Sequence, residues 1–451
     1  MWDVGVNEPV LVVGGGLAGS EAAWQLAEAG LRVVMAEMRP ARPTPVHRGG
    51  QLAELVCSNS LRGDSPANAV GLLKREMAAL DSLIIRCARS AAVPAGGALA
   101  VDRERFAAAV TDAVTGHPRI TIERREVEEL PEGPALLATG PLTSPALHAA
   151  LARLLGEGAL AFYDAIAPIV AVDSLDLSRL FRGSRYGKGG SDDYLNAAMD
   201  RSCYEQFVAA LLAAEKHPFK AFELEDIRYF EGCLPIEVMA ERGLDTLRFG
   251  PMKPVGLSDP ATGRRPYAVV QLRQDDLAAE HWNLVGFQTK LTAAEQGRVF
   301  RTIPGLEQAR FVRFGMIHRN TFLNAPVHLD PLLRLRRRAD LRVAGQLTGV
   351  EGYVESAATG LVAARTLAAE LAGADPQPPP PETACGGLVH HLTESRPDGF
   401  QPANVSWGLI AAPPEVAAVR SRRERRERHA ALAVERIRAW AATLRGAARE
   451  S

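Results

Sequence analysis

Two of the five cysteines have sequence surroundings that suit a reactive thiol. Cys57 lies in LVCSNSLRGD, between an apolar pair and a polar run, and Cys233 lies in FEGCLPIE, at a turn that opens a helix. Hydrogen-bond donors and the amides at a helix start both favour a thiolate. From these surroundings alone, each cysteine is either a nucleophile or a small buried apolar side chain. The neighbours of Cys57 that can donate to a thiolate or to a phosphate are Ser58, Asn59, Ser60 and Arg62.

The other three cysteines indicate ordinary core positions. Cys87, Cys203 and Cys385 are widely spaced, and the chain contains no C-x-x-C pair. An odd number of scattered cysteines argues against a disulfide framework and against a zinc site. We therefore expect free thiols in a reducing compartment and no metal centre.

A glycine loop near the start predicts a dinucleotide site. Val10–Val13 reads as a strand, residues 20–30 read as a helix closed by glycine, and residues 31–37 read as a second strand. In such a unit the glycines let the backbone approach a pyrophosphate at the helix start, and an acidic residue ending the second strand binds a ribose hydroxyl. The alternative is an accidental glycine turn. The predicted binding residues are Gly14, Gly15, Gly16, Leu17, Ala18, Gly19 and Glu37.

Two later segments favour FAD as the resident dinucleotide. PALLATGPLTS (134–144) and LRVAGQLTGVEGYVESAATG (341–360) resemble the later FAD contacts of glutathione-reductase-like flavoproteins, whose FAD domain is closed from the far end of the chain. The fold class implied is α/β, with a Rossmann-like FAD-binding domain, discontinuous in sequence, and an inserted α+β domain. The expected boundaries are 1–160, 161–335 for the insertion, and 336–451 for the returning part with a basic C-terminal helix. The further cofactor-binding residues expected are Thr139, Gly140, Gly345, Gly349, Glu351 and Tyr353.

The insertion is expected to contain strands at YAVVQLRQ (267–274) and NLVGFQTKL (283–291) and a helix over 202–215. It contains no second G-x-G-x-x-G, because YGKGG at 186–190 has the wrong spacing. A nicotinamide donor would then visit the flavin transiently rather than occupy a domain of its own.

Composition is that of an ordinary globular protein: 451 residues, 47% hydrophobic, 23% charged, with a formal net charge of −1. Bulk charge gives no case for nucleic-acid or membrane binding, so any polyanion site must be local. The start of the chain lacks the features of a signal peptide and no apolar run is long enough to span a membrane, so we expect a cytoplasmic protein. Two arginine-rich stretches, 333–342 and 420–428, are either solvated faces or phosphate contacts.

Motifs along most of the chain resemble one family, the folate- and FAD-dependent tRNA (uracil-5-)-methyltransferases, which make ribothymidine in the T loop. The matching segments are VVGGGLAGSEAAWQLA, AELVCSNSLR, FEGCLPIEVMAERG, LRFGPMKPVGL, YAVVQLRQ, NLVGFQTKL, IHRNTF, GQLTGVEGYVESAATG and FQPANVSWGL. The resemblance implies a methyltransferase that uses FAD, 5,10-methylenetetrahydrofolate and NADH or NADPH. It implies tRNA as the partner, with no membrane and no obligatory protein partner, and leaves the oligomeric state open.

Alkylation at uracil C5 needs a nucleophile that adds to C6 and a base that removes the C5 proton. When the one-carbon unit arrives at the oxidation level of formaldehyde, a hydride is also needed to reduce it to a methyl group. The resemblance implies Cys57 and Cys233 as the catalytic thiols. Spacing does not assign their roles, although an insertion that receives a large substrate favours Cys233 as nucleophile. The candidates for a wall opposite the flavin are His318 and Tyr353; Arg248 and Lys253 are either anion contacts or members of surface salt bridges.

Three alternatives stay open at this point. A member of the related glucose-inhibited division protein A family, acting at the wobble uridine, is expected to be longer, with a helical domain after the FAD fold. A flavin-stabilised tRNA-binding protein would not need either cysteine. A thiol oxidoreductase is disfavoured because the chain has neither a paired-cysteine motif nor a second nucleotide fingerprint.

Overall fold

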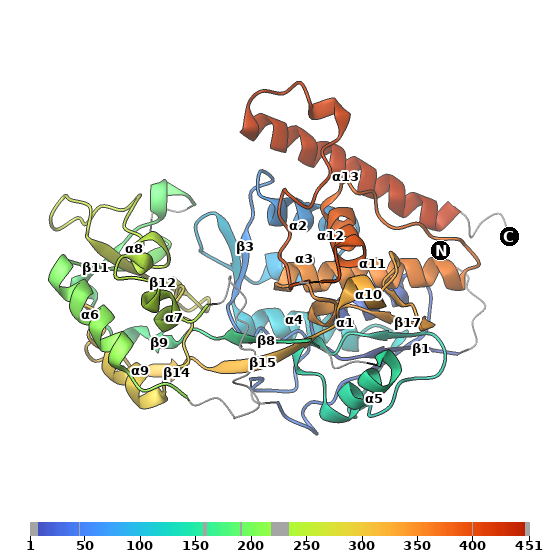
Figure 1. The fold of residues 1–451 in the computed structure, drawn as a ribbon, viewed down its shortest axis with the longest axis horizontal. Helices are drawn as coiled ribbons and strands as arrows, with labels where there is room; N and C mark the ends of the chain where they lie inside the picture. Colours follow the sequence, from blue (N-terminus) through green and yellow to red (C-terminus); the bar gives the residue numbers. More distant parts are fainter. Residues whose placement is uncertain are drawn as a thin grey trace.

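The computed structural model describes residues 8–44, 46–156, 160–189, 192–217, 234–398 and 400–446. Two lobes of unequal size are joined by an antiparallel pair of strands, β8 (Leu160–Ala165) and β15 (Ile317–Phe322) (Figure 1). The larger lobe contains both ends of the described chain. No helix within the described ranges has the length and apolar character needed to cross a membrane.

The larger lobe is built on a six-stranded sheet in the order β16-β17-β7-β1-β2-β6. Its strands are parallel except at the β16–β17 edge, as expected for the Rossmann-like half of the predicted fold. Strand β17 comes from far along the chain and pairs with β7, so the sheet is completed only when the returning segment folds. The strands are β1 (Val10–Val13), β2 (Val33–Ala36), β6 (Ile120–Glu123), β7 (Ala135–Leu137), β16 (Arg334–Leu335) and β17 (Arg338–Val343).

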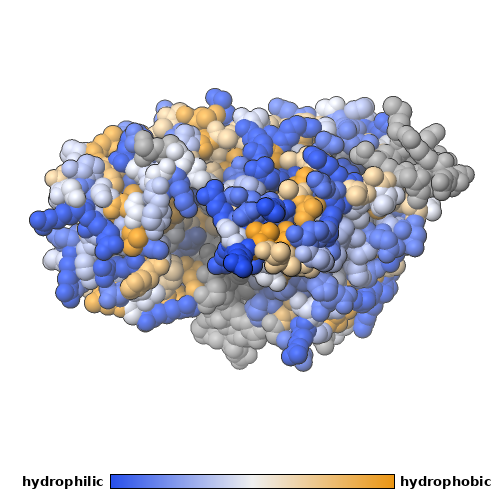
Figure 2. Space-filling view, turned by 90° about the horizontal axis from the view of Figure 1, so that it is seen from above, coloured by the Kyte–Doolittle hydropathy of each residue, from blue (hydrophilic) through white to orange (hydrophobic). Residues whose placement is uncertain are grey.

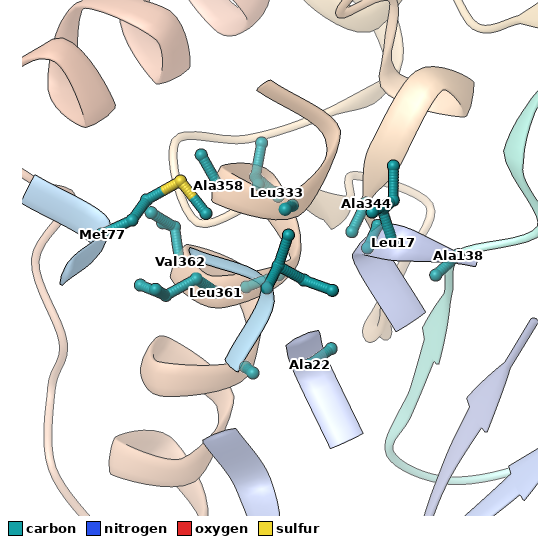
Figure 3. Close-up of a cluster of buried hydrophobic side chains, with 14 of the residues drawn as sticks. Leu17, Ala22, Met77, Ala138, Leu333, Ala344, Ala358, Leu361 and Val362 are labelled. Atoms are coloured by element: carbon teal, nitrogen blue, oxygen red, sulfur yellow. The ribbon is translucent and has the colours of Figure 1, made fainter. Parts of the chain in front are cut away.

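Helices α1 (Leu17–Glu28) and α11 (Tyr353–Leu371) pack closely because small residues face each other. A Cβ atom on Gly360 would lie 2.3 Å from the carbonyl oxygen of Ala18, so only glycine fits there. Figure 3 shows Leu361 and Val362 of α11 near Met77 of helix α2 (Ala69–Ala79) within one buried cluster. The first and last parts of the chain therefore share a single hydrophobic core.

The smaller lobe has its own core around a second sheet, in the order β10-β11-β12-β13-β9-β14. Neighbouring strands are antiparallel, and α6 covers the predicted 202–215 region. Residues 323–335, which we expected in the insertion, instead pack in the core of the larger lobe. The elements are β9 (Ile169–Ala171), β10 (Leu180–Arg182), β11 (Tyr194–Met199), β12 (Ala268–Gln274), β13 (His281–Leu284), β14 (Phe311–Arg313), α6 (Arg201–Ala213), α7 (Ile236–Glu241), α8 (Thr246–Phe249) and α9 (Ala293–Phe300).

One predicted strand of the insertion is formed only at its first two residues. The prediction for 283–291 is wrong beyond Leu284, where β13 ends. Gly286 follows with a φ of 79°, and a Cβ there would lie 2.5 Å from that of Pro251. Because only glycine fits this turn, the chain leaves the sheet, and Leu291 forms an isolated bridge to Lys216.

The remaining elements cover the main sheet or lead to the site. A three-stranded sheet, in the order β3-β5-β4, follows the first βαβ unit and lies between the two lobes in Figure 1. Its strands are β3 (Ser60–Gly63), β4 (Ala92–Val93) and β5 (Ala98–Val101). The helices are α3 (Leu83–Ser90), α4 (Arg103–Thr115), α5 (Pro145–Leu155), α10 (Ala325–His328), α12 (Ala384–Glu394) and α13 (Arg422–Gly446).

A buried carboxyl joins α2 to the start of α12. Glu76 accepts hydrogen bonds from the backbone N–H groups of Ala384 (2.7 Å) and Cys385 (2.9 Å). Within the described ranges no cationic side chain forms an ion pair with it, and burial raises its pKa to about 7. A raised pKa means that the folded protein binds the proton more tightly, so this stability is present below the unfolded pKa and is lost as the pH rises through about 7.

We therefore expect the Glu76→Gln variant to lose less stability than the wild type between pH 6 and pH 8. A group titrating near 7 changes the free energy of unfolding by about 1 kcal/mol over that interval. Urea unfolding at the two pH values measures the difference, with Glu104→Gln at an exposed position of α4 as the control. Equal pH dependence in the wild type and in Glu76→Gln would contradict the assignment.

Candidate functional site

A large cavity lies where the glycine loop, the ends of β2 and β7 and the start of α11 meet. Its empty volume is about 1060 Å³, including solvent at its mouth. Four segments distant in sequence contribute to its walls. The predicted residues that line it are Gly14, Gly15, Gly16, Leu17, Ala18, Glu37, Thr139, Gly140, Gly345 and Tyr353.

The glycine loop has the geometry that its sequence pattern requires. Gly14 has a φ of 102°, and a Cβ on it would lie 2.5 Å from the carbonyl oxygen of Ala138. At Gly16 a Cβ would meet nothing within 4 Å, because that position faces the cavity. Gly19 does not line the cavity; a Cβ there would lie 1.8 Å from the carbonyl oxygen of Gly14, so this glycine permits helix α1 to pack against the loop.

Glu37 stands at the end of β2 with its carboxylate in the cavity wall. It accepts hydrogen bonds from Gly15 N (2.7 Å), Arg39 N (2.9 Å) and Arg39 Nε (2.9 Å). Burial opposes its charge, but the hydrogen bonds and charge of Arg39 outweigh burial and lower the pKa of Glu37. A ribose hydroxyl would therefore meet an ionised carboxylate and would share it with Arg39, a residue that the sequence pattern did not single out.

The Cys57 segment is anchored to the mouth of the cavity by Tyr353. The Tyr353 hydroxyl accepts hydrogen bonds from the backbone N–H groups of Cys57 (2.7 Å) and Ser58 (3.1 Å). Arg103 holds the same segment from the other side, donating from Nη2 to the Cys57 carbonyl oxygen at 3.1 Å. Val56 lines the cavity, and the half-buried Cys57 follows it directly in the chain without being one of the lining residues.

Three arginines, of which Arg273 is buried and Arg103 and Arg313 are half-buried, give this edge a positive field. Cys57 is close enough to interact electrostatically with Arg103, Arg273 and Arg313. Burial, and then the charge of Arg103, lowers the pKa of Arg313 to about 10, so these cations repel one another and favour a nearby anion. Arg103 is balanced by Asp275, 3.0 Å away. These cations suit an anionic substrate group.

The polar residues after Cys57 have partners other than its thiol. Asn59 is fully buried and donates to the carbonyl oxygens of Val101 (3.0 Å) and Gln274 (2.9 Å). Ser58 Oγ accepts from Arg273 Nη2 at 2.7 Å. The backbone N–H of Arg62 donates to Ser60 Oγ, and its guanidinium pairs with Glu355. These side chains fix the segment, which differs from their expected role as donors to the thiol.

Lys74 adds a second clamp on the strand that follows Cys57. Its buried ammonium donates to the carbonyl oxygens of Leu61 (2.9 Å), Arg62 (3.1 Å) and Gly63 (2.9 Å). Burial lowers the pKa of Lys74 to about 8. Sequence reasoning missed Lys74, Arg103 and Arg273; for Arg273 alone a signal existed, since it lies in the matching segment YAVVQLRQ.

Some predicted residues lie apart from the cavity or outside the described residues. Gly349 packs against the ring of Phe400, and Glu351 accepts from Gln346 Nε2 at 2.7 Å without lining the cavity. Cys233 lies outside the described residues, as does the side chain of His318.

The other residues singled out from the sequence lie on the smaller lobe or in the hydrophobic core of the larger lobe. Arg248 pairs with Asp245 at 2.8 Å, as in the salt-bridge alternative, while Lys253 lines a shallow basic pocket beside it. Cys87 and Cys385 are buried, as expected for core thiols, and Cys203 is half-buried on α6.

The anchoring by Tyr353 leads to a testable expectation. Tyr353→Phe leaves two part-buried N–H groups without their acceptor, at a cost of about 1–3 kcal/mol each. We expect kcat for nucleoside modification to fall about 10–100-fold, because small displacements of a reacting group are costly; flavin content is measured in parallel, since Tyr353 also lines the cavity. Tyr204→Phe, which loses a 2.6 Å bond to the Leu244 carbonyl oxygen on the smaller lobe, is the control. Equal kcat values for the two variants would show that the anchor does not matter.

Comparison with known proteins finds relatives that match most of this chain. The family model described as glucose inhibited division protein A matches residues 9–375. Methylenetetrahydrofolate--tRNA-(uracil-5-)-methyltransferase TrmFO of Moorella thermoacetica is 56% identical over 431 residues, covering 95% of this chain and 98% of that protein. The TrmFO of Rhodospirillum rubrum is 60% identical over 411 residues, covering 90% of this chain and 85% of that protein.

Among solved structures, GidA of Aquifex aeolicus in its form II crystal has a TM-score of 0.69 at 17% identity, covering 97% of this chain and 73% of that one. Its form I crystal gives a TM-score of 0.67 at 16% identity, with coverages of 97% and 78%. The predicted α/β fold, with a discontinuous Rossmann-like domain and an inserted domain, is confirmed. By sequence, the chain belongs to the methylenetetrahydrofolate--tRNA-(uracil-5-)-methyltransferase TrmFO family, and the glucose inhibited division protein A family model matches most of its length.

Proposed function

We propose that the protein transfers the methylene carbon of 5,10-methylenetetrahydrofolate to C5 of a uridine in the T loop of tRNA and reduces it to a methyl group. The observation that carries this proposal is the position of Cys57, whose backbone is anchored by Tyr353 next to the cavity that the glycine loop lines, with three arginines nearby. Relatives with 56–60% identity bear the corresponding name.

The cavity suits FAD on structural grounds. The Gly16 position is open to the cavity, the α1 N-terminus points its free amides there, and Glu37 offers an ionised carboxylate. The residues that would hold the cofactor are the glycine loop, Glu37, Thr139 and Gly140, with Gly345 and Tyr353 on the returning segment. Reduced flavin bound there would supply the hydride that turns the transferred methylene into methyl. NADH or NADPH is the proposed external reductant.

The thiols are proposed to handle the uracil ring. A thiolate adds to C6 and forms an S–C6 bond, which makes C5 nucleophilic; C5 then bonds to the methylene carbon as the bond from that carbon to the folate nitrogen breaks and tetrahydrofolate leaves. A base removes the C5 proton, the S–C6 bond breaks, and the methylene group left on C5 would take up the hydride that reduced flavin supplies. We propose that one of Cys57 and Cys233 adds to C6 and that the other handles the C5 proton. Arg103, Arg273 and Arg313 lie close enough to interact electrostatically with Cys57 and with a substrate bound beside it.

The same arginines can bind an anion. Both the glutamate tail of a folate and a tRNA phosphate carry negative charge, and buried guanidinium groups bind such oxygens well. Because the uridine lies within a folded loop, it must leave its stack to reach the cavity edge.

A second candidate deserves its own test, since the matching family model covers the wider division-protein family. In that case the modified uridine would be at the wobble position of the anticodon. Incubating the protein with unmodified tRNA transcript, NADPH and a donor with isotopic carbon at the methylene group distinguishes the two. Label in a T-loop fragment as ribothymidine supports our proposal, and label confined to the anticodon fragment supports the alternative.

A further inference from the structure

The arginine-rich beginning of α13 carries charges that the protein does not neutralise. Two of its arginines form surface pairs, Arg423 with Glu427 at 2.9 Å and Arg428 with Glu424 at 2.7 Å. No described carboxylate forms an ion pair with Arg422, Arg425 or Arg426. Burial, followed by repulsion from Arg422 and Arg425, lowers the pKa of Arg426, as expected for a cluster without counter-charge.

A groove runs beside these arginines and ends at an aromatic ring. Its empty volume is about 980 Å³, and its walls include Trp407, Pro413, Arg422, Arg425 and Arg426. The guanidinium of Arg426 lies 5.5 Å from the centre of the Trp407 ring. We call this surface the α13 groove.

Trp407 is held firmly in place rather than lying loose on the surface. Its indole Nε1 donates to the carbonyl oxygen of Ala67 at 2.8 Å, and its ring centre lies 5.1 Å from that of His429. Ala67 is four residues beyond the end of β3, the strand that begins three residues after Cys57. The α13 groove is thereby tied to the same chain segment as the candidate catalytic thiol.

The groove lies on the side of the molecule where the two lobes separate. In Figure 1, α13 runs along the upper edge of the larger lobe, and its arginine-rich end is the one nearer the smaller lobe. Figure 2, seen from that side, shows hydrophilic residues of the larger lobe beside a hollow between the lobes. A substrate that enters the hollow from above would pass this end of the helix.

We propose that the α13 groove binds the sugar–phosphate backbone of the RNA substrate, at a distance from the uridine that reacts. This inference rests on the proposed function. Free guanidinium groups in a row match a polyphosphate, whereas the chain as a whole has a net charge of −1 and cannot attract RNA by bulk charge. A fixed indole next to an arginine also offers a face on which an unstacked base can stack. An acidic protein partner would use the arginine charges but would not need an aromatic ring beside them. RNA can use both, so RNA fits the α13 groove better than an acidic protein does.

The test compares two triple variants with the same change in charge. In the first, Arg422, Arg425 and Arg426 become glutamine. In the second, three exposed arginines from other parts of the protein become glutamine. Each of these arginines forms an ion pair with a nearby carboxylate; they are Arg105, Arg153 and Arg201. Kd for a full-length tRNA transcript is measured over a range of salt concentrations, with kcat at saturating tRNA and flavin content measured in parallel.

For the α13 variant we expect Kd to rise about 10–100-fold and the slope of log K against log salt to become less steep by about 2–3, since each phosphate contact contributes about 0.9. We expect kcat and flavin content to stay at wild-type values, and the control variant to bind like the wild type. An unchanged Kd and slope in the α13 variant would overturn the proposal. Wild-type protein that binds tRNA through this groove without methylating it would disprove only the proposed function.

Discussion

The Cys57→Ala variant is expected to retain its cofactor and to lose methyl transfer to tRNA. Tyr353 and Arg103 hold the Cys57 backbone next to the cavity, within electrostatic range of Arg273. Whether Cys57 attacks C6 or removes the C5 proton, its loss should lower kcat at least about 10²-fold, the lower end for a positioned proton-transfer group. Ribothymidine formation and the flavin absorbance of the purified protein are the two measurements.

Cys203→Ala serves as the matched control for this prediction. Cys203 is half-buried on α6 of the smaller lobe and does not line the cavity. Its replacement should leave kcat unchanged. If Cys57→Ala were as active as Cys203→Ala, Cys57 would be a structural thiol and the two-thiol chemistry would be wrong.

The Gly16→Val variant is expected to fold and yet to bind almost no FAD. A Cβ at Gly16 meets no protein atom within 4 Å, so a side chain there enters the cavity without disturbing the empty protein. It occupies the space through which a pyrophosphate would approach the amides of α1. We expect flavin content after purification to fall at least about 10-fold, with methyl transfer lost in proportion.

Gly97→Val is the control for that substitution. Gly97 is exposed, its Cβ would also meet nothing within 4 Å, and it lies outside the cavity. Circular dichroism and thermal unfolding show whether both variants keep the fold. Normal flavin content in a folded Gly16→Val protein would place the cofactor elsewhere.

The parts of the fold that sequence predicted are those fixed by local patterns. The strand, glycine loop, helix and second strand over residues 10–37 follow from β-branched runs and from the glycines that the turn requires. The returning strand and small-residue helix were predictable from their residue pattern and from the resemblance to glutathione-reductase-like flavoproteins; the structure shows Gly360 packed against α1. The limit of local patterns appears at Gly286, where packing against Pro251 ends a strand that the apolar pattern continues.

The surroundings of Cys57 were not predictable, because they are made by residues far away in the sequence. Tyr353 reaches the Cys57 backbone across 296 residues, and Arg273 reaches Ser58 across 215. Charge clusters are equally ambiguous in sequence. In the 333–342 stretch, Arg342 pairs with Glu370 and is buried, and Arg338 pairs with Asp340, whereas at the start of α13 several charges stay free.

The most direct test of the account is the origin of the hydrogens in the new methyl group. The protein is incubated with unmodified tRNA transcript, NADPH and 5,10-methylenetetrahydrofolate that carries two deuterium atoms on its methylene carbon, and the T-loop nucleoside and the folate product are analysed by mass spectrometry. We predict ribothymidine whose methyl group retains both deuterium atoms and gains one unlabelled hydrogen, with tetrahydrofolate as the co-product. Formation of dihydrofolate, or a T loop that stays unlabelled while the protein holds FAD, would contradict the account.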